Sequence, residues 1–234
     1  MKLIGLLGAV GWKTTANYYR MINEYTRREL GGAHTARILL HSSNTQMLDH
    51  HQRSNEWPQI GEILGEAGRS LKAGGADFIV LTSNSMHQVA DLIRSKSELD
   101  LLHIAEPAGA RIYDDGHQLV ALIGTRNTME SDFYQNWLGE RYGITVIAPE
   151  ATERARVHEI IFDELADGVI HPGSRRYISD LIGKLHERGA QGIILGCSEI
   201  TTIVPPDYDL IPVYDTTRLH ARAAVQRALE EHHV

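Results

Sequence analysis

The sequence contains an internal repeat, and this repeat constrains the fold more than any other feature of the chain. Residues 75–85, Gly-Ala-Asp-Phe-Ile-Val-Leu-Thr-Ser-Asn-Ser, align without a gap with residues 189–199, Gly-Ala-Gln-Gly-Ile-Ile-Leu-Gly-Cys-Ser-Glu. Each segment begins with Gly-Ala, continues as an apolar run and ends in small polar residues. A second pair supports the duplication, because Leu3–Gly8 matches Leu119–Gly124. The chain is therefore predicted to consist of two related halves.

Short apolar runs recur along the whole chain and alternate with longer amphipathic stretches. Runs of this length that are apolar on both faces suit the strands of a parallel sheet covered by helices. The expected strands are Lys2–Leu7, Ala36–Leu40, Phe78–Leu81, Leu101–Ile104, Leu119–Ile123, Thr145–Ile147, Gly192–Leu195 and Ile211–Tyr214. The expected helices are Thr15–Leu30, Gln59–Ala73, Ser131–Tyr142, Ala155–Gly168, Ser174–Arg188 and Thr217–Glu231. Alternating strands and helices predict an α/β fold.

The repeat also predicts where the domains meet. Asp114-Asp115-Gly116 marks a turn just before the second copy begins. We expect an N-terminal α/β domain of residues 1–115 together with 211–234, because the last strand and helix are left over after the second repeat. Residues 116–210 are expected to form the C-terminal α/β domain.

Composition argues against several classes of function and location. The 234 residues carry a net charge of −7, which argues against a nucleic-acid-binding surface. The single cysteine cannot form an internal disulfide, which favours a reducing, cytoplasmic compartment. The N-terminal apolar run superficially resembles a signal peptide, but the matching internal run at Leu119 favours a buried strand. No apolar stretch approaches the length of a membrane-spanning helix, so no membrane partner is expected.

The repeat aligns Ser83 with Cys197, the only cysteine of the chain. Ligands of open parallel sheets bind at the carboxyl ends of the strands, and both residues follow such an end. Gly8–Thr15 and Gly124–Thr128 lie at equivalent strand ends. These four strand ends are expected to converge on one cleft between the halves.

Cys197 is expected at the start of a helix, where N–H groups and the helix dipole favour a thiolate that acts as base or nucleophile. The alternative is a buried cysteine that packs as a small hydrophobic residue. Ser83, Asn84 and Ser85 offer hydroxyls, an amide and N–H groups that suit a carboxylate, and they are equally good helix caps.

Other polar side chains near the strand ends have the same two interpretations, binding or capping; they are Thr14, Thr125 and Thr128. Gln52 and Arg53 are expected in the loop after the second strand, where they either reach the cleft or remain solvated. His87 follows Ser83 by one helical turn and either tunes the site or packs. None of the 13 histidines forms a metal-binding signature, so no metal is expected.

Several motifs, taken in order along essentially the whole chain, resemble those of the aspartate/glutamate racemase family. The motifs are Ile4–Gly8 with Trp12, Thr14-Thr15 and Tyr18-Tyr19; His41-Ser42; Ser83–His87; His103–Ala105; Gly124–Met129; Gly196–Ile200; and Pro212–Thr217 with His220-Ala221. Within this family the chain is most similar to the bacterial amino-acid racemase branch, as a single-cysteine variant resembling an L-aspartate/glutamate-specific racemase.

The resemblance implies cofactor-independent proton transfer at the α-carbon of a small acidic amino acid. It implies two pseudo-symmetric, Rossmann-like α/β domains and a homodimer. In typical members two cysteines face each other across the substrate, and here Cys197 occupies the second cysteine position and Ser83 the first. It implies that Ser83–Ser85 and Ser198-Glu199 hold the α-carboxylate, and that Gln52 and Thr125 with nearby hydroxyls hold the second carboxylate.

Ser83 in place of a cysteine predicts asymmetric catalysis. A serine hydroxyl is far less acidic than a thiol, which titrates near about 8.5, and without an adjacent base it abstracts protons poorly. Cys197 is therefore expected to abstract the proton from the L-enantiomer, and Ser83 or a water that it holds is expected to return one.

Two other functions remain compatible with the sequence. A single thiol opposite a serine also suits a malonate-type decarboxylase or a cis-trans isomerase such as maleate isomerase, both of the same superfamily. The loss of one thiol also suits a catalytically retired protein that binds an amino acid.

Overall fold

The computed structural model describes residues 1–205 and 207–230. The chain divides into two compact units, Met1–Ile104 with the segment from His220 onward, and Ala105–Leu219. Each unit contains a parallel four-stranded sheet with helices packed on it, so the predicted α/β class is confirmed. In the described part of the chain, no helix combines the length and the apolar character that a membrane span requires.

The first sheet has the strand order β2-β1-β3-β4, and all its neighbours are parallel. Its strands are β1 (Ile4–Gly8), β2 (Ile38–Ser42), β3 (Phe78–Leu81) and β4 (Asp100–Leu102). The helices of this unit are α1 (Trp12–Leu30), α2 (Thr45–Arg53), α3 (Trp57–Ala73), the 3-10 turn η1 (Ser85–Val89), α4 (Ala90–Ser97) and the greater part of α10 (Thr216–Leu229).

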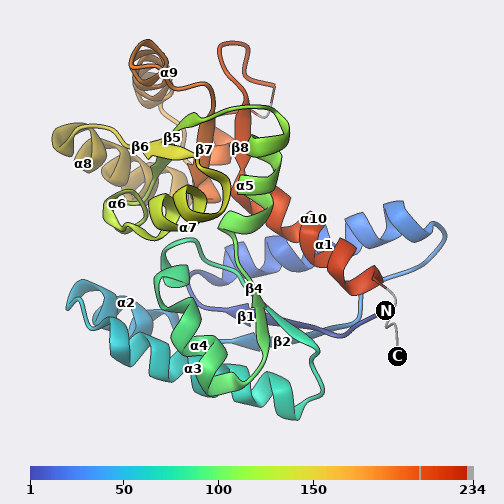
Figure 1. Cartoon of the computed structure of the whole chain (residues 1–234). Helices are drawn as coiled ribbons and strands as arrows, with labels where there is room; N and C mark the ends of the chain where they lie inside the picture. The colour runs from blue at the N-terminus through green and yellow to red at the C-terminus, as the bar shows by residue number, and fades with distance from the viewer. Residues whose placement is uncertain (206, 231–234) are drawn as a thin grey trace. The chain divides into compact units, whose positions relative to one another are not determined.

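Helices α3 and α4 cover one face of this sheet, and α1 and α10 cover the other (Figure 1). Alternate residues of the strands face two separate cores. Leu7, Ile79 and Leu81 pack with residues of α3 and α4 on one face. Leu6 and Val80 pack on the other face with residues of α1 and α10. Burial on both faces explains why these strands read as continuous apolar runs in the sequence.

The second sheet has the order β6-β5-β7-β8, again entirely parallel. Its strands are β5 (Leu119–Gly124), β6 (Thr145–Ile147), β7 (Ile193–Gly196) and β8 (Val213–Asp215). Its helices are α5 (Ala105–Asp114), α6 (Arg126–Glu130), α7 (Phe133–Tyr142), α8 (Ala151–Glu159), the π-helical turn η2 (Ile160–Glu164), the 3-10 turns η3 (Leu165–Asp167) and η4 (Glu199–Thr202), and α9 (Pro172–Glu187). Residues of α8, η2 and α9 pack on one face of this sheet, and α5 and α7 lie on the other (Figure 1).

The two sheets share one topology, as the repeat predicts. The matched runs at the chain start and at Leu119 form β1 and β5, which occupy the same position in their sheets. The other matched runs form β3 and β7, which also occupy equivalent positions. Ser83 and Cys197 therefore follow corresponding strands of the two units.

The assignment of the last strand was wrong. We expected residues 211–234 to join the N-terminal domain, but β8 pairs with β7 through Ile194 and Tyr214 and completes the second sheet. The unit boundaries fall at Ile104 and at His220, within α10, rather than at residues 115 and 211. Residues 231–234 of the expected first domain, including the end of the expected helix Thr217–Glu231, lie outside the described residues.

The expected helix Ala155–Gly168 is divided into three pieces. Helix α8 ends at Glu159, and the π-helical turn and a 3-10 turn follow. Gly168 ends this segment in the left-handed region, with φ of 79°. Helices α2, α4, α5 and α6 were not predicted.

Candidate active site

The carboxyl edge of the first sheet is held by two buried threonines. Thr82 follows β3 and donates its hydroxyl to the Leu7 carbonyl at 3.3 Å. Because that proton is used, the Thr15 hydroxyl donates to Thr82 Oγ1 at 2.9 Å. A Cβ atom on Gly8 would lie 2.9 Å from Thr15 Oγ1, so only glycine allows the start of α1 to come this close to β1. The strand ends that precede Ser83 are thus fixed in place.

Three predicted residues come together at this edge. The Ser83 and Ser85 hydroxyls lie 3.5 Å apart, and Gln52 donates to Ser85 Oγ at 3.4 Å. Asn84 and Ser85 are each 9% exposed. Among the described residues, no basic side chain contacts the Ser83 hydroxyl.

Gln52 and Arg53 lie in the last turn of α2, and the expectation of a loop was wrong. Asn44 caps this helix by accepting a hydrogen bond from the Gln46 N–H. Arg53 pairs with Asp49 one turn earlier at 2.9 Å, and its side chain is 79% exposed. Gln52 therefore lies at the serine cluster, whereas the guanidinium of Arg53 is held on the surface by Asp49. Thr14 lies in the first turn of α1 and is half-buried.

The corresponding edge of the second sheet is also tightly packed. A Cβ atom on Gly196 would lie 2.8 Å from Thr128 Cγ2, and one on Gly124 would lie 2.9 Å from the Gly196 carbonyl oxygen. The hydroxyls of Thr125 and Thr128 lie 3.0 Å apart, and Thr128 is buried. Both predicted threonines thus lie together at the start of α6.

Cys197 lies next to these glycines and is 7% exposed, at the edge of the apolar core of its unit. Its Sγ atom donates to Oε2 of Glu199 at 2.8 Å, and the Ser198 hydroxyl donates to the same oxygen at 2.9 Å. The structure therefore brings together the three predicted residues Cys197, Ser198 and Glu199.

The expectation that the fold favours a Cys197 thiolate was wrong for the resting protein. Burial raises the pKa of this thiol well above its ordinary value, and the negative charge and hydrogen bond of Glu199 raise it further. The backbone N–H groups of Glu199 and Ile200 act in the opposite direction, but they begin only a single 3-10 turn. No long helix dipole therefore offsets the burial, and the resting group is a thiol.

His87 and His220, noted in the sequence without an assigned role, belong to a buried cluster behind Ser83. Nδ1 of His87 lies 2.6 Å from the Ser83 carbonyl oxygen. The His87 ring contacts His103 and His220 with centroid distances of 4.9 and 5.6 Å. In the described residues, no group of three or more potential ligands from His, Cys, Asp and Glu is arranged for a metal ion.

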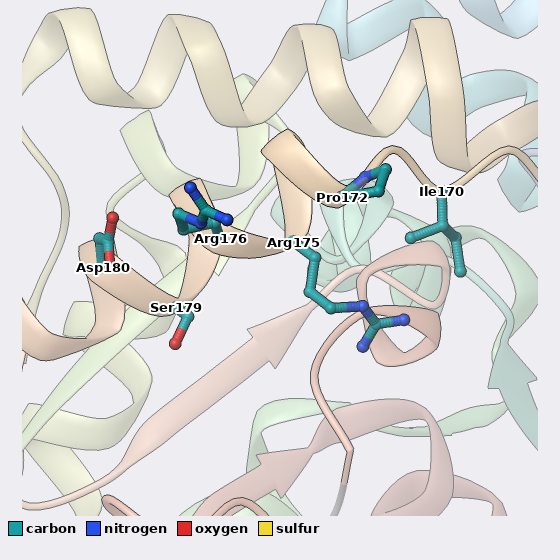
Figure 2. A pocket seen from close by; sticks show the side chains of 6 residues that line it. All are labelled: Ile170, Pro172, Arg175, Arg176, Ser179 and Asp180. Atoms are coloured by element: carbon teal, nitrogen blue, oxygen red, sulfur yellow. The ribbon is translucent and has the colours of Figure 1, made fainter.

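A surface hollow of about 530 Å³ lies along α9 (Figure 2). Its lining residues are Ile170, Pro172, Arg175, Arg176, Ser179 and Asp180. Arg175 donates to the Ile203 carbonyl, and Ser179 is hydrogen-bonded to Tyr208. Since Arg175 and Ser179 already have partners, we assign no chemistry to the hollow.

Comparison with known proteins identifies the class. The sequence profile of the Asp/Glu/Hydantoin racemase family matches residues 7–224, and the chain belongs to this family. A crystal structure from Yersinia pestis, provisionally described as an Asp/Glu racemase, is 43% identical, with a TM-score of 0.92 over 98% of this chain and 100% of that one. The structure of an aspartate racemase homologue from Pyrococcus horikoshii OT3 is 30% identical, with a TM-score of 0.85 over 98% of this chain and 100% of that one.

These findings indicate a racemase, an isomerase by reaction class. A variant of arylmalonate decarboxylase is also similar, with a TM-score of 0.55 and 12% identity over 97% of this chain and 93% of that one. That likeness concerns the fold alone.

Proposed function

We propose that this chain is a cofactor-independent racemase of aspartate or glutamate that acts preferentially on the L-enantiomer. The observation that carries the proposal is the difference between two aligned positions. The Cys197 thiol donates to a carboxylate that can accept its proton, whereas in the described part of the chain the Ser83 hydroxyl neighbours another hydroxyl. The racemase family and the relatives named for aspartate support the substrate class.

The reaction requires a thiolate, and Glu199 is the group positioned to accept the thiol proton. A shift of that proton from Sγ to Oε2 forms the thiolate and removes the carboxylate charge that opposes it. The thiolate then takes the α-proton of the L-substrate and leaves an enolate-like carbanion. Ser83, or a water that it holds, delivers a proton to the other face of the carbon. Glu199 then releases the thiol proton to solvent, and solvent returns one proton to Ser83, so that both groups regain their starting states. The product is the D-enantiomer, and no atom of a cofactor is consumed.

Polar groups of each unit are proposed to hold the two substrate carboxylates. In the first unit these are Asn84 and Ser85, with Gln52 and Thr14; in the second they are Thr125, Thr128 and Ser198, with the backbone N–H of Glu199. Hydrogen bonds to a charged carboxylate are among the stronger ones in proteins, and they support the charge that develops at the α-carbon. The carboxylate of Glu199 would repel the substrate, so its proposed role is limited to the thiol.

The proposed enzyme works on a free amino acid as a homodimer in the cytoplasm, without nucleic-acid or membrane partners. The single cysteine supports a reducing compartment, and the net charge of −7 supports a partner other than nucleic acid.

Chiral chromatography of L-aspartate and L-glutamate incubated with the protein tests this function. We expect the D-enantiomer to accumulate with the wild-type protein, and we expect no product with Cys197→Ala. Lack of D-product from both amino acids, or equal product from the Cys197→Ala variant, contradicts the proposal.

One observation also favours single-thiol decarboxylation or cis-trans isomerisation as a second candidate. The resting Cys197 is protonated, and a protonated thiol is the group that must deliver a proton to a carbanion after carbon dioxide leaves. Carbon dioxide release from an arylmalonate, without conversion of amino acids, would favour the decarboxylase. Binding of aspartate or glutamate without any reaction would favour a retired amino-acid-binding protein.

A further inference from the structure

His87 is almost completely buried in the first unit, behind the segment that carries Ser83. It lies in the 3-10 turn η1 and is 2% exposed, and its backbone N–H donates to the Asn84 carbonyl at 3.1 Å. Its Nδ1 atom lies 2.6 Å from the Ser83 carbonyl oxygen. A carbonyl oxygen only accepts hydrogen bonds, so Nδ1 carries the proton and donates it.

The ring is held in this orientation by its neighbours. His220 donates from Nε2 to the Leu102 carbonyl at 2.9 Å, which leaves its Nδ1 to accept from the Tyr18 hydroxyl at 3.0 Å. The His220 ring and the His103 ring both contact His87 edge to face. A flip of the His87 ring would therefore break the hydrogen bond to Ser83, and the ring would still be packed against His103 and His220.

The protonation state of His87 is equally constrained. Burial lowers the pKa of His87 to about 4, against the hydrogen bond to Ser83, which raises it. The neutral ring then has its only proton on Nδ1. Nε2 is buried and has no hydrogen-bond partner within residues 1–205 and 207–230. The shortest hydrogen bond of this ring is thus the one to the Ser83 carbonyl, and the backbone groups of Leu102 and Asn84 raise the pKa by less than that of Ser83.

Fixing the Ser83 carbonyl also fixes the next N–H group. The peptide bond between Ser83 and Asn84 is trans and planar, so its C=O and N–H bonds point in opposite directions. With the carbonyl turned toward His87, the Asn84 N–H points away from the histidine cluster. The same hydrogen bond holds the backbone from which the Ser83 hydroxyl projects.

We propose that His87 is a positioning residue that orients the Ser83–Asn84 peptide, so that the Asn84 N–H binds a substrate carboxylate and the Ser83 hydroxyl is held for proton delivery. This proposal rests on the proposed function, because it needs the segment 83–85 to bind the substrate. His87 thus acts on the substrate site through its hydrogen bond to the backbone, and it does not contact the reacting atoms.

Two substitutions at position 87 separate positioning from packing. Asparagine places an amide N–H close to the position of Nδ1, whereas glutamine places it near Nε2. We expect His87→Gln to raise KM for the L-substrate by about tenfold or more, as the loss of one hydrogen bond to a charged group does. We expect His87→Asn to restore KM to within about threefold. We expect kcat to fall in His87→Gln, because the Ser83 hydroxyl is no longer held for proton delivery, and to recover in His87→Asn.

Tyr18→Phe is the matched control. It removes the hydrogen bond to His220 from the same cluster and leaves the Ser83 carbonyl untouched. We expect it to lower the Tm without changing KM. Equal KM increases in His87→Gln and His87→Asn, or an equal increase in Tyr18→Phe, would show that the cluster acts only through stability and would overturn the proposal.

Nitrogen-15 NMR of the histidine rings tests the arrangement independently of activity. We expect His87 at pH 7 to be neutral, with a protonated Nδ1 and an unprotonated Nε2. Protonation at Nε2 instead overturns the proposed contact, whatever the enzyme does. If this tautomer is found and the protein neither converts nor binds acidic amino acids, the proposed function fails and the substrate-orienting role fails with it, while the contact itself stands.

Discussion

The Sγ atom of Cys197 lies 2.8 Å from Oε2 of Glu199, so the only thiol of the chain faces a carboxylate. This contact is stabilising while the sulfur is protonated and repulsive once it ionises. Both effects raise the pKa of the thiol beyond the effect of burial. In the Cys197–Glu199 pair the proton therefore stays on the sulfur until it is transferred to the carboxylate.

Removal of the Glu199 charge should make Cys197 more reactive. We expect Glu199→Gln to lower the thiol pKa and to increase the rate of alkylation by iodoacetamide at pH 7.5, about tenfold for each unit of lowering. The same variant should lose racemase activity, because the proton acceptor is gone. Glu140→Gln, on an exposed residue of α7, is the matched control and should change neither rate. An alkylation rate in Glu199→Gln equal to that of the wild type would disprove the account of this pair.

A second thiol at position 83 should remove the preference for the L-enantiomer. Within residues 1–205 and 207–230, the hydrogen-bond partner of the Ser83 hydroxyl is the hydroxyl of Ser85, and a thiol is more acidic than a hydroxyl by several units. We expect Ser83→Cys to exchange the α-proton of D-aspartate or D-glutamate at least tenfold faster than the wild type. The rates are compared by proton NMR in deuterated buffer, with Ser83→Thr as the control that keeps a hydroxyl. A Ser83→Cys variant as slow as Ser83→Thr on the D-substrate would mean that acidity at this position does not limit the reaction.

The buried histidines should make the protein less stable in mild acid. Burial lowers the pKa of His87 to about 4 and that of His220 to about 3, against 6.5 in the unfolded chain. Below pH 6.5 the two histidines therefore bind protons in the unfolded chain, whereas in the folded protein His87 binds one only near pH 4 and His220 only near pH 3. The contribution of each neutral histidine to the free energy of unfolding is fully present above pH 6.5. It is lost as the pH falls, and the loss is about 2 kcal/mol per histidine at pH 5.

Urea unfolding at pH 7.5 and at pH 5 measures this loss. His103 and Tyr18 are among the groups that face His87 and His220. Asp100 has a lowered pKa and stays ionised at pH 5, so it does not account for the loss of stability between the two pH values. His220→Gln should reduce the difference in unfolding free energy between the two pH values by about 2 kcal/mol. An unchanged difference in this variant would show that His220 is not the source.

Close packing at the carboxyl edge of the second sheet predicts a large cost for one added methyl group. A Cβ atom on Gly196 would meet Thr128 Cγ2 at 2.8 Å and Leu122 Cδ1 at 2.9 Å. We expect Gly196→Ala to lower the free energy of unfolding by about 1–3 kcal/mol. Gly183→Ala, in α9 with nothing within 4 Å of the added atom, should instead gain up to about 1 kcal/mol. Equal unfolding free energies for the two variants would contradict the packing seen at Gly196.

The strands were predictable from the sequence because most are buried on both faces of their sheets. All eight expected strands are present within a few residues, and the repeat predicted two related halves without giving the strand order of either sheet. The partner of β8 was not predictable, since apolar periodicity indicates a strand without specifying its neighbour. Helix α2 was missed because Leu48 is its only buried residue, although its cap Asn44 is a signal that could have marked its start.

The site residues were predictable in position but not in chemical state. The strand ends drew attention to Ser83, Ser85 and Cys197, and the structure places Gln52 against Ser85 and Glu199 against Cys197. For Gln52 the sequence had left open whether it reaches the strand ends or remains solvated. The sequence favoured a thiolate because a helix was expected after Cys197. The structure has a single 3-10 turn there and a carboxylate against the sulfur, and neither feature follows from residue spacing.

Exchange of the α-proton for deuterium, followed by proton NMR, tests the central claim most directly. L- and D-aspartate and L- and D-glutamate are each incubated with the wild-type protein and with Cys197→Ala in deuterated buffer. We predict that the L-forms lose their α-proton signal much faster than the D-forms, and that Cys197→Ala abolishes the loss. Equal exchange of both enantiomers, or exchange that survives in Cys197→Ala, would contradict the assignment of Cys197 as the working base.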